Sequence, residues 1–129
     1  MTYLTPQDIL VIHARIIEET GGLHGIRDIG LLVSLTERPK ASFGRKEMYP
    51  GIFEKAATYL ESLVRYHVFV DGNKRTSIAA SARFLFINGF AITASNQEVE
   101  AFVLKVVEEK LTIGIIVAWL KRYFQKIKK

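Results

Sequence analysis

The residues best suited to chemistry in this chain lie within one short segment. Residues 65–76 combine a titratable base, an acid, a flexible residue and two cations, namely His67, Asp71, Gly72, Lys74 and Arg75. A histidine has a reference pKa of about 6.5, so it is largely neutral near neutral pH and can accept a hydroxyl proton. His67 is therefore the candidate general base.

The part of the segment that follows Asp71 is suited to bind an anion. Gly72 can adopt backbone conformations that are closed to other residues, so successive N–H groups can turn inward around an anion. A helix that begins there would add its unpaired N–H groups and its positive dipole end, and Lys74 and Arg75 would add full charges. Together these features favour a polyphosphate ligand.

Asp71 and Phe69 are expected to support this site in different ways. Mg²⁺ usually takes one or two carboxylates, together with water and substrate phosphates. Asp71, beside the predicted anion site, is the natural carboxylate for such an ion. Phe69 is the large apolar residue between His67 and Asp71, so we expect it to anchor the loop to the core and to fix the direction of His67.

A purely structural interpretation of the same residues is also open. His67 could end one helix, Asp71 and Asn73 could cap the next, and Gly72 could make the turn between them. Lys74 and Arg75 would then be solvated side chains. The residues taken singly do not decide between the two interpretations.

The elements that must position this segment are helices. Capping residues, apolar residues at helical spacing and terminating glycines predict six of them. The expected spans are about residues 5–20, residues 28–38, residues 52–67, residues 73–88, a helix capped by Ser95 and a last helix capped by Thr112. They predict an all-α fold, a compact bundle of about six helices, formed as a single domain over residues 1–129.

Residues 38–51 break the helical pattern. They contain two prolines, two glycines and four basic residues without a helical period. We expect a loop or a short hairpin flap that forms one wall of the active site and holds an extended target segment by backbone pairing. Arg45 and Lys46 are the residues expected to contact an acidic target.

Composition excludes several classes of site. The chain has no cysteine, and its three histidines show no close pairing, which argues against a structural zinc site. No apolar run is long enough to cross a membrane, and no leader is evident, so we expect a cytoplasmic protein. The net charge of +5 suits phosphate-bearing ligands or acidic proteins. A non-catalytic helical module that binds nucleic acid or protein is the less favoured alternative, because such a module needs neither His67 nor Asp71.

The order of residues 67–75 resembles the signature of the Fic/Doc family. That signature has a histidine, any residue and a phenylalanine, then two residues, glycine or alanine, asparagine, glycine or lysine, and arginine. Gly21-Gly22-Leu23 and Asn88-Gly89 look like the Doc ("death on curing") branch, so the resemblance covers nearly the whole chain.

The resemblance implies a six-helix fold, a requirement for ATP and Mg²⁺, and modification of a Ser or Thr hydroxyl on a target protein. It implies that His67 is the base and that Asp71 lies near the metal. It also implies that the phosphates are bound by Gly72, Asn73, Lys74 and Arg75, and that Arg65 matches an arginine that precedes the histidine in Doc. A surface ion pair is an equal alternative for Arg65.

Two positions bear on which group is transferred. Adenylylating Fic enzymes typically have glycine after the asparagine and a second arginine three residues beyond the first, where this chain has Lys74 and Ile78. Doc-like toxins, which are similar to this chain at both positions, transfer the terminal phosphoryl group. Kinase chemistry is therefore favoured, and adenylyl transfer is the alternative.

The sequence also predicts how the protein is controlled. Many Fic proteins inhibit themselves through a motif of Ser/Thr, three residues, Glu and Gly/Asn, and this chain has no copy of it. Resemblance to Doc implies the toxin of a toxin–antitoxin pair, acting on a translation elongation factor and inhibiting growth. We therefore expect an acidic antitoxin segment that acts in trans.

Overall fold

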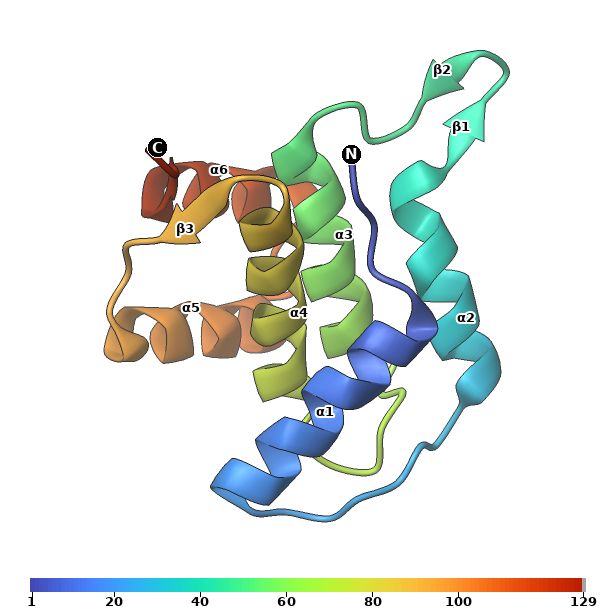
Figure 1. Cartoon of the computed structure of the whole chain (residues 1–129), viewed down its shortest axis with the longest axis vertical. Coiled ribbons are helices and arrows are strands. Elements are labelled where there is room, and N and C mark those ends of the chain that lie inside the picture. Colours follow the sequence, from blue (N-terminus) through green and yellow to red (C-terminus); the bar gives the residue numbers. More distant parts are fainter. Residues whose placement is uncertain (129) are drawn as a thin grey trace.

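A central helix, α3 (Ile52–Arg65), organises the fold in the computed structural model, which describes residues 1–128. The remaining elements are α1 (Pro6–Thr20), α2 (Ile29–Glu37), a 3₁₀ turn η1 (Arg38–Lys40), β1 (Ser42–Phe43), β2 (Lys46–Glu47), α4 (Asn73–Ile87), β3 (Phe90–Ile92), α5 (Asn96–Glu109), α6 (Ile113–Tyr123) and β4 (Phe124–Lys126). Six α-helices over the described residues confirm the predicted all-α bundle (Figure 1).

Helix α3 is enclosed by other helices on most of its surface. It packs against α2, α4, α5 and α6, and nine of its 14 residues are buried. Its small residues Ala56 and Ala57 let neighbouring backbones approach closely, and Ser81 of α4 donates a hydrogen bond of 2.8 Å to the Ala56 carbonyl. The antiparallel pair α3–α4 is therefore the core of the molecule, and residues 66–72 join the two helices at one end.

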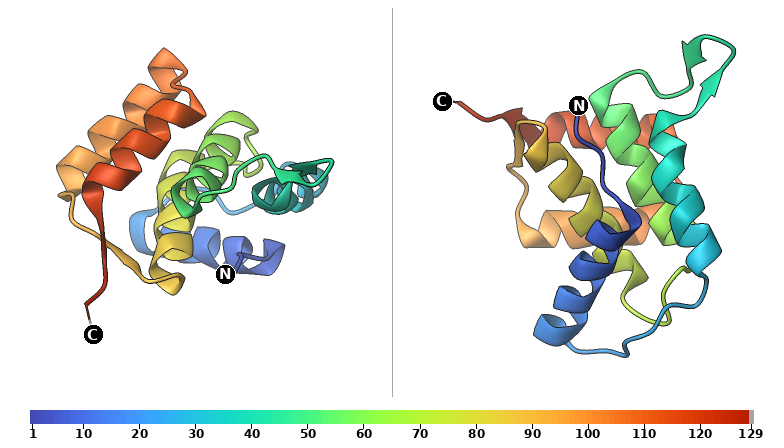
Figure 2. Two further views of the ribbon diagram at one scale, coloured as in Figure 1. Left: turned by 90° about the horizontal axis from the view of Figure 1, so that it is seen from above. Right: turned by 45° about the vertical axis from the view of Figure 1, so that its right-hand side comes forward.

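The other helices cover this pair from two sides. Figure 2 shows α5 and α6 on one side of α3–α4 and α1 and α2 on the other. The Phe102 and Trp119 rings stack between α5 and α6 with centroids 4.3 Å apart. The chain before α1 is tied to α3 by the Leu4 N–H, which donates to the Tyr59 hydroxyl over 3.1 Å. The hydrogen bond between Leu4 and Tyr59 fixes the start of α1 against α3, and so the direction in which α1 approaches the α3–α4 loop.

Local capping explains where most helices begin. The side chains of Thr5 and Ser95 each accept a hydrogen bond in a capping box, and Asp28 accepts one from Leu31, as predicted. Thr112 occupies the N-cap position of α6, but its side chain makes no capping hydrogen bond. Its expected capping role is therefore wrong in that detail.

Two small antiparallel strand pairs supplement the helices. β1 pairs with β2 to form the hairpin that was one of the two expected forms of residues 38–51. Its base is tied to α3 by the buried Lys55, whose ammonium donates to the Pro39 carbonyl and to Glu47 over 2.9 Å each. β3 pairs with β4 and was not predicted, because neither three-residue segment shows a clear alternating pattern.

None of the helices described over residues 1–128 combines the length and the apolar character that a membrane crossing requires.

Candidate active site

The loop that joins α3 to α4 begins at His67, where the backbone takes a left-handed conformation with φ of 47°. The Arg27 guanidinium closes the end of α3 by donating to the His67 carbonyl over 2.7 Å and to the Tyr66 carbonyl over 3.0 Å. This bond pair holds the backbone of His67, while its side chain is exposed. The imidazole is therefore accessible to a substrate.

The next residues of the loop pair with the segment between α1 and α2. The Val68 carbonyl accepts from Arg27 and Asp28, over 2.7 and 3.1 Å, and the Val70 N–H donates to the Gly25 carbonyl over 3.0 Å. Ile26 and Phe69 face each other in an isolated bridge between these strand-like segments. Residues 22–28 therefore hold the loop backbone in one conformation. Sequence reasoning missed this role, although the clustered glycines at 21, 22 and 25 were a signal.

Phe69 and Asn73 fix the middle of the loop. Phe69 is 1% exposed and lies in the core. The Asn73 side chain accepts from the Phe69 N–H over 3.0 Å and donates to the Phe69 carbonyl over 2.9 Å. Phe69 thus lies where an anchor residue must lie. The amide of Asn73 is occupied by this brace, which leaves its backbone N–H as the group that can face a phosphate.

The start of α4 has the form expected of an anion site. Gly72 is the N-cap residue, with φ of 76° and ψ of 17°, in the left-handed region that favours glycine. The N–H groups of residues 73–75 have no partner within the helix, because they belong to its first turn. They lie at the positive end of a 15-residue helix. A phosphate group fits both the donors and the field there.

Asp71 is held by two backbone donors. Its carboxylate accepts from the Leu23 N–H over 3.1 Å and from the Gly72 N–H over 2.8 Å, and it lies 4.0 Å from the Arg75 guanidinium. The hydrogen bonds from Leu23 and Gly72, and then the charge of Arg75, hold the pKa of the Asp71 carboxyl below its ordinary value. Asp71 is therefore ionised at neutral pH. Its two hydrogen bonds do not cap α4, because the donors Leu23 and Gly72 both lie outside that helix.

The Asp71 carboxylate also fits a Mg²⁺ ion. Its side chain is 43% exposed, and each oxygen uses only one hydrogen bond to the backbone. Across residues 1–128, no three His, Asp or Glu side chains gather as a metal cluster. A single carboxylate, completed by water and substrate phosphates, is the set of ligands that Mg²⁺ commonly takes. The residues present are thus suited to a metal that arrives with a polyphosphate.

The three cations of the prediction take different positions. Arg75 donates to the Thr20 hydroxyl and, over 3.2 Å, to the Gly21 carbonyl at the end of α1. Lys74 is exposed. Arg65 donates to the Leu111 carbonyl over 2.7 Å and pairs with Glu61 over 3.9 Å.

Arg65 therefore makes its contacts outside the predicted phosphate site. Its guanidinium is directed to the turn between α5 and α6, and it does not line the cavity described next. Its ion pair with Glu61 agrees with the alternative interpretation, and a role of Arg65 in binding phosphate stays a prediction. Arg65 is the last residue of α3, and its side chain extends toward Leu111, between α5 and α6.

A cavity of about 300 Å³ brings the other candidates together. It lies at the end of the α3–α4 pair, and Val64 and Val107 form apolar walls. The remaining lining residues are His67, Val70, Asp71, Gly72, Asn73, Lys74 and Arg75. A histidine, a carboxylate and a cationic helix start therefore meet in one place.

A second concavity of about 300 Å³ adjoins this cavity along the groove between α4 and α5. Lys74 and Arg75 line both. Its other walls are mostly apolar and consist of Ile78, Val99, Glu100, Val103 and Leu104. The cations thus lie between a polar cavity and an apolar slot.

The β1–β2 hairpin does not form a wall of the cavity, so that expectation is wrong. None of residues 38–51 lines it. The hairpin leads into the start of α3 and the loop of His67 leaves its end, which places them at opposite ends of that helix in Figure 1. Helix α3 has 14 residues and spans about 21 Å. Arg45 and Lys46 are exposed at the hairpin, and their contact with a target stays a prediction.

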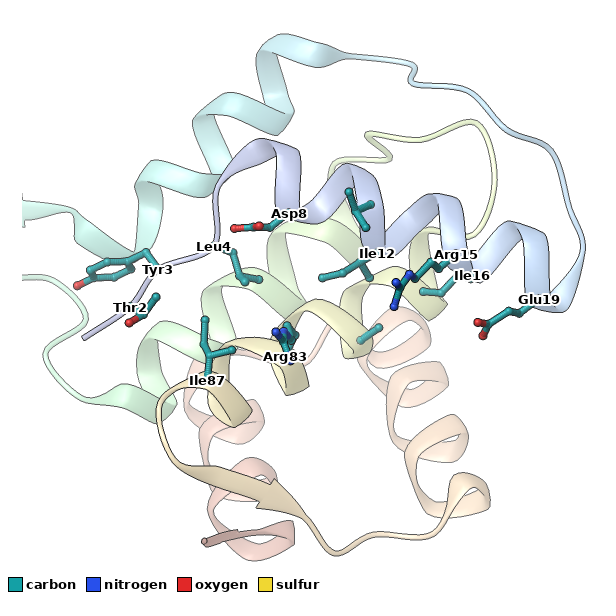
Figure 3. Close-up of a pocket in the computed structure, with 12 residues that line it drawn as sticks. Thr2, Tyr3, Leu4, Asp8, Ile12, Arg15, Ile16, Glu19, Arg83 and Ile87 are labelled. Atoms are coloured by element: carbon teal, nitrogen blue, oxygen red, sulfur yellow. The ribbon is translucent and has the colours of Figure 1, made fainter.

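A wider groove of about 760 Å³ lies between α1, α4 and the chain before α1. Figure 3 shows Ile12, Ile16 and Arg15 on the α1 side and Arg83 and Ile87 on the α4 side. No residue of the loop or of the first turn of α4 lines it. The chemistry-bearing residues therefore belong to the smaller cavity.

A bundle of this kind, with a histidine loop before a cationic helix start, defines a family of enzymes. A model described as the Fic/DOC family matches residues 3–85, and the chain belongs to this family. It is similar to Toxin Doc of Mycolicibacterium smegmatis, with 42% identity over 92 residues, covering 71% of this chain and 68% of the relative. It is also similar to Protein kinase doc of Escherichia phage P1, with 34% identity over 92 residues, covering 71% of this chain and 72% of the relative.

The closeness of Gly22 to the Asp71 side chain gives a test of whether this carboxylate governs metal binding. A Cβ at Gly22, where φ is +116°, would lie 2.7 Å from an Asp71 carboxylate oxygen, whereas one at Gly21, where φ is +85°, would meet nothing within 4 Å. Both substitutions carry a backbone strain of about 1–3 kcal/mol. Gly22→Ala should in addition turn the carboxylate away and raise the Mg²⁺ concentration needed for half-maximal activity.

Gly21→Ala is the matched control, because it carries the strain without the contact. Urea unfolding measures the strain in each variant, and a Mg²⁺ titration of activity measures the site. Equal Mg²⁺ requirements in the two variants would show that the position of the Asp71 carboxylate does not govern metal binding.

Proposed function

We propose that this protein is a Doc-like toxin that transfers the terminal phosphoryl group of ATP to a Ser or Thr hydroxyl of a target protein. The observation that carries the proposal is the single cavity that joins the exposed imidazole of His67 to the cationic start of α4. The names of two relatives, Toxin Doc and Protein kinase doc, support it. Resemblance to Doc suggests a translation elongation factor as the target.

The residues at positions 74 and 78 favour phosphoryl transfer over adenylyl transfer. Lys74 lines the cavity, where its side chain takes space beside the helix start. Ile78 lies in the apolar slot between α4 and α5, so this part of α4 offers no second arginine to clamp inner phosphates. A site with one lysine and one arginine at the helix start suits a terminal phosphate. Adenylyl transfer remains the alternative, and the mass added to the target distinguishes it from phosphoryl transfer.

The cavity residues divide the work of the reaction. His67 takes the proton of the target hydroxyl, whose oxygen forms a bond to the terminal phosphorus of ATP. The bond from that phosphorus to the bridging oxygen breaks, and ADP leaves with the electron pair. The N–H groups of the first turn of α4, with Lys74 and Arg75, hold the transferred group.

Asp71 would hold Mg²⁺ against the phosphate oxygens. When bound, the ion neutralises charge on the phosphates and so makes the terminal group easier to attack. Val64 and Val107 wall the cavity and keep water from part of the site. The ionised state of the Asp71 carboxylate at neutral pH is the state this role needs.

The base is tested by His67→Ala, with the exposed His24→Ala as the matched control. Loss of the base should lower the rate by about 10²-fold to 10⁴-fold, because proton removal then falls to water. The fold should persist, since the His67 side chain is exposed and the bonds of Arg27 go to backbone carbonyls. The measurement is the mass added to the target after incubation with ATP and Mg²⁺.

Added mass equal to one phosphoryl group supports the kinase, and added mass equal to one adenylyl group replaces it with the alternative. A folded His67→Ala protein that keeps full activity and full toxicity would remove His67 from the mechanism. A non-catalytic binding module would then be the better explanation.

Target recognition is proposed to involve the β1–β2 hairpin. Arg45 and Lys46 are exposed there, and the Phe43 side chain between strand and turn is 87% exposed. Arg45→Glu with Lys46→Glu should weaken target modification but spare ATP binding, which is measured by calorimetry. The double change Lys126→Glu and Lys128→Glu controls for the same change in net charge. Equal effects of the two pairs would assign the loss to overall charge and not to the hairpin.

Control is proposed to come from a separate acidic antitoxin segment that binds in trans. The chain carries a net charge of +5 and lacks the inhibitory motif of other Fic proteins. An acidic segment that folds on binding can cover a large basic surface with modest affinity per unit area.

Expression with and without the neighbouring open reading frame tests this control. We expect toxicity only without it, and binding of the purified partner should weaken with salt, because exposed charges are screened beyond about 8–10 Å at physiological ionic strength. A chain that is harmless alone, and that gains no activity when freed of co-purifying protein, would contradict inhibition in trans.

A further inference from the structure

A buried histidine lies directly beneath the loop, and the mechanism above gives it no role. His13, in the middle of α1, is 4% exposed. Its ring stacks on Phe69, with centroids 3.8 Å apart and an interplanar angle of 5°. Its Nε2 lies 2.8 Å from the backbone carbonyl oxygen of Asp71. A carbonyl oxygen can only accept, so Nε2 carries the proton and donates.

We propose that His13 is a positioning residue for the phosphate-binding turn. It fixes the orientation of the peptide group between Asp71 and Gly72, and so determines which face of the turn meets a phosphate. The inference rests on the proposed function, because it assigns His13 a part in binding the nucleotide.

The geometry of a trans peptide gives the reason. The C=O and N–H of one planar peptide group point in opposite directions. Holding the Asp71 carbonyl inward on His13 therefore turns the Gly72 N–H outward, where it now donates to the Asp71 carboxylate over 2.8 Å. If the same peptide group were reversed, its carbonyl oxygen would point outward toward the phosphate, and the Gly72 N–H would no longer donate to the Asp71 carboxylate.

Glycine alone does not select between these orientations. It populates positive and negative φ about equally, so the observed value of +76° at Gly72 needs an outside contact to fix it. The His13 hydrogen bond is such a contact. A partly buried carbonyl that lost this donor would lack a protein partner, which biases the peptide orientation toward the observed one.

The direction of the bond is itself determined by the stack on Phe69. Asn73 holds both backbone polar groups of Phe69, and Phe69 in turn holds the plane of the His13 ring. This series of contacts runs from Asn73 through Phe69 and His13 to Asp71. It begins and ends within four residues of the chain, yet it passes through α1, to which His13 belongs. It makes the shape of the turn dependent on the position of α1.

Two substitutions separate the hydrogen bond from the packing. His13→Phe keeps a flat ring for the stack and removes the donor, whereas His13→Gln keeps an N–H donor and removes the ring. We expect His13→Phe to lower kcat/KM for ATP by about 10-fold to 100-fold, because a small misplacement of a binding group is costly. KM for the target protein should stay within about twofold of wild type, since the target does not contact the turn's peptide group. His13→Gln should recover most of the loss.

Ile9→Ala is the control, because Ile9 is a fully buried residue of the same helix. It loosens α1 without removing the hydrogen bond from α1 to the loop, and urea unfolding compares its stability with that of the His13 variants. Binding of ADP with Mg²⁺ by calorimetry gives a readout that does not depend on the target. It should weaken in His13→Phe more than in Ile9→Ala.

The outcomes separate this inference from the proposed function. A wild-type protein that neither binds nucleotide nor modifies a target refutes the proposed function, and the inference with it. A functional wild type with His13→Phe equal to Ile9→Ala, or with equal losses in His13→Phe and His13→Gln, overturns the positioning role alone. In wild type the Nε2 proton should appear as a slowly exchanging ring signal by nuclear magnetic resonance. Its absence overturns the role even if the variants fail to fold.

Discussion

The structure depends on hydrogen-bond partners for the backbone N–H and C=O groups of residues 66–72, which lie against the end of the core. Backbone N–H and C=O groups that leave a helix must find partners when water is excluded. Here the partners come from the segment between α1 and α2, through Arg27 and Gly25, and from α4, through the Asn73 side chain. Hydrogen bonds consequently fix the backbone of this loop, as they fix a strand. These bonds form only when α1, α2 and α4 are in place.

This constraint explains how the site can combine groups with opposite requirements. In the proposed reaction the base must be open to a protein hydroxyl, and the phosphate needs backbone donors that do not move. Because Arg27 holds His67 only through backbone carbonyls, the imidazole remains exposed. Because Gly72 starts a helix whose far turns are buried against α3, its N–H groups belong to a rigid element. The end of an antiparallel helix pair supplies both properties at once.

The sequence predicted the parts of this arrangement that are local. Capping residues and helical periods placed all six helices, and the spacing of residues 67–75 located the loop, because these signals act within a few residues. The partners of the loop lie far away in sequence. His13 is separated from Asp71 by 58 residues, and nothing local distinguishes it from any other core histidine. Likewise, the position of the hairpin and the direction of Arg65 follow from tertiary packing, which a periodic pattern does not encode.

The distance between the hairpin and the cavity limits what the hairpin can do. In the proposed reaction a target hydroxyl must reach His67 at one end of α3. Arg45 and Lys46 lie near the other end, and the helix between them is about 21 Å long. A contact at the hairpin cannot place the reacting oxygen within hydrogen-bond reach of the imidazole. It can strengthen binding of the target equally in the ground state and in the transition state, which lowers KM without raising kcat. The orientation of the hydroxyl must instead come from the surface beside the loop, where Leu23, Ile26 and Val70 are exposed.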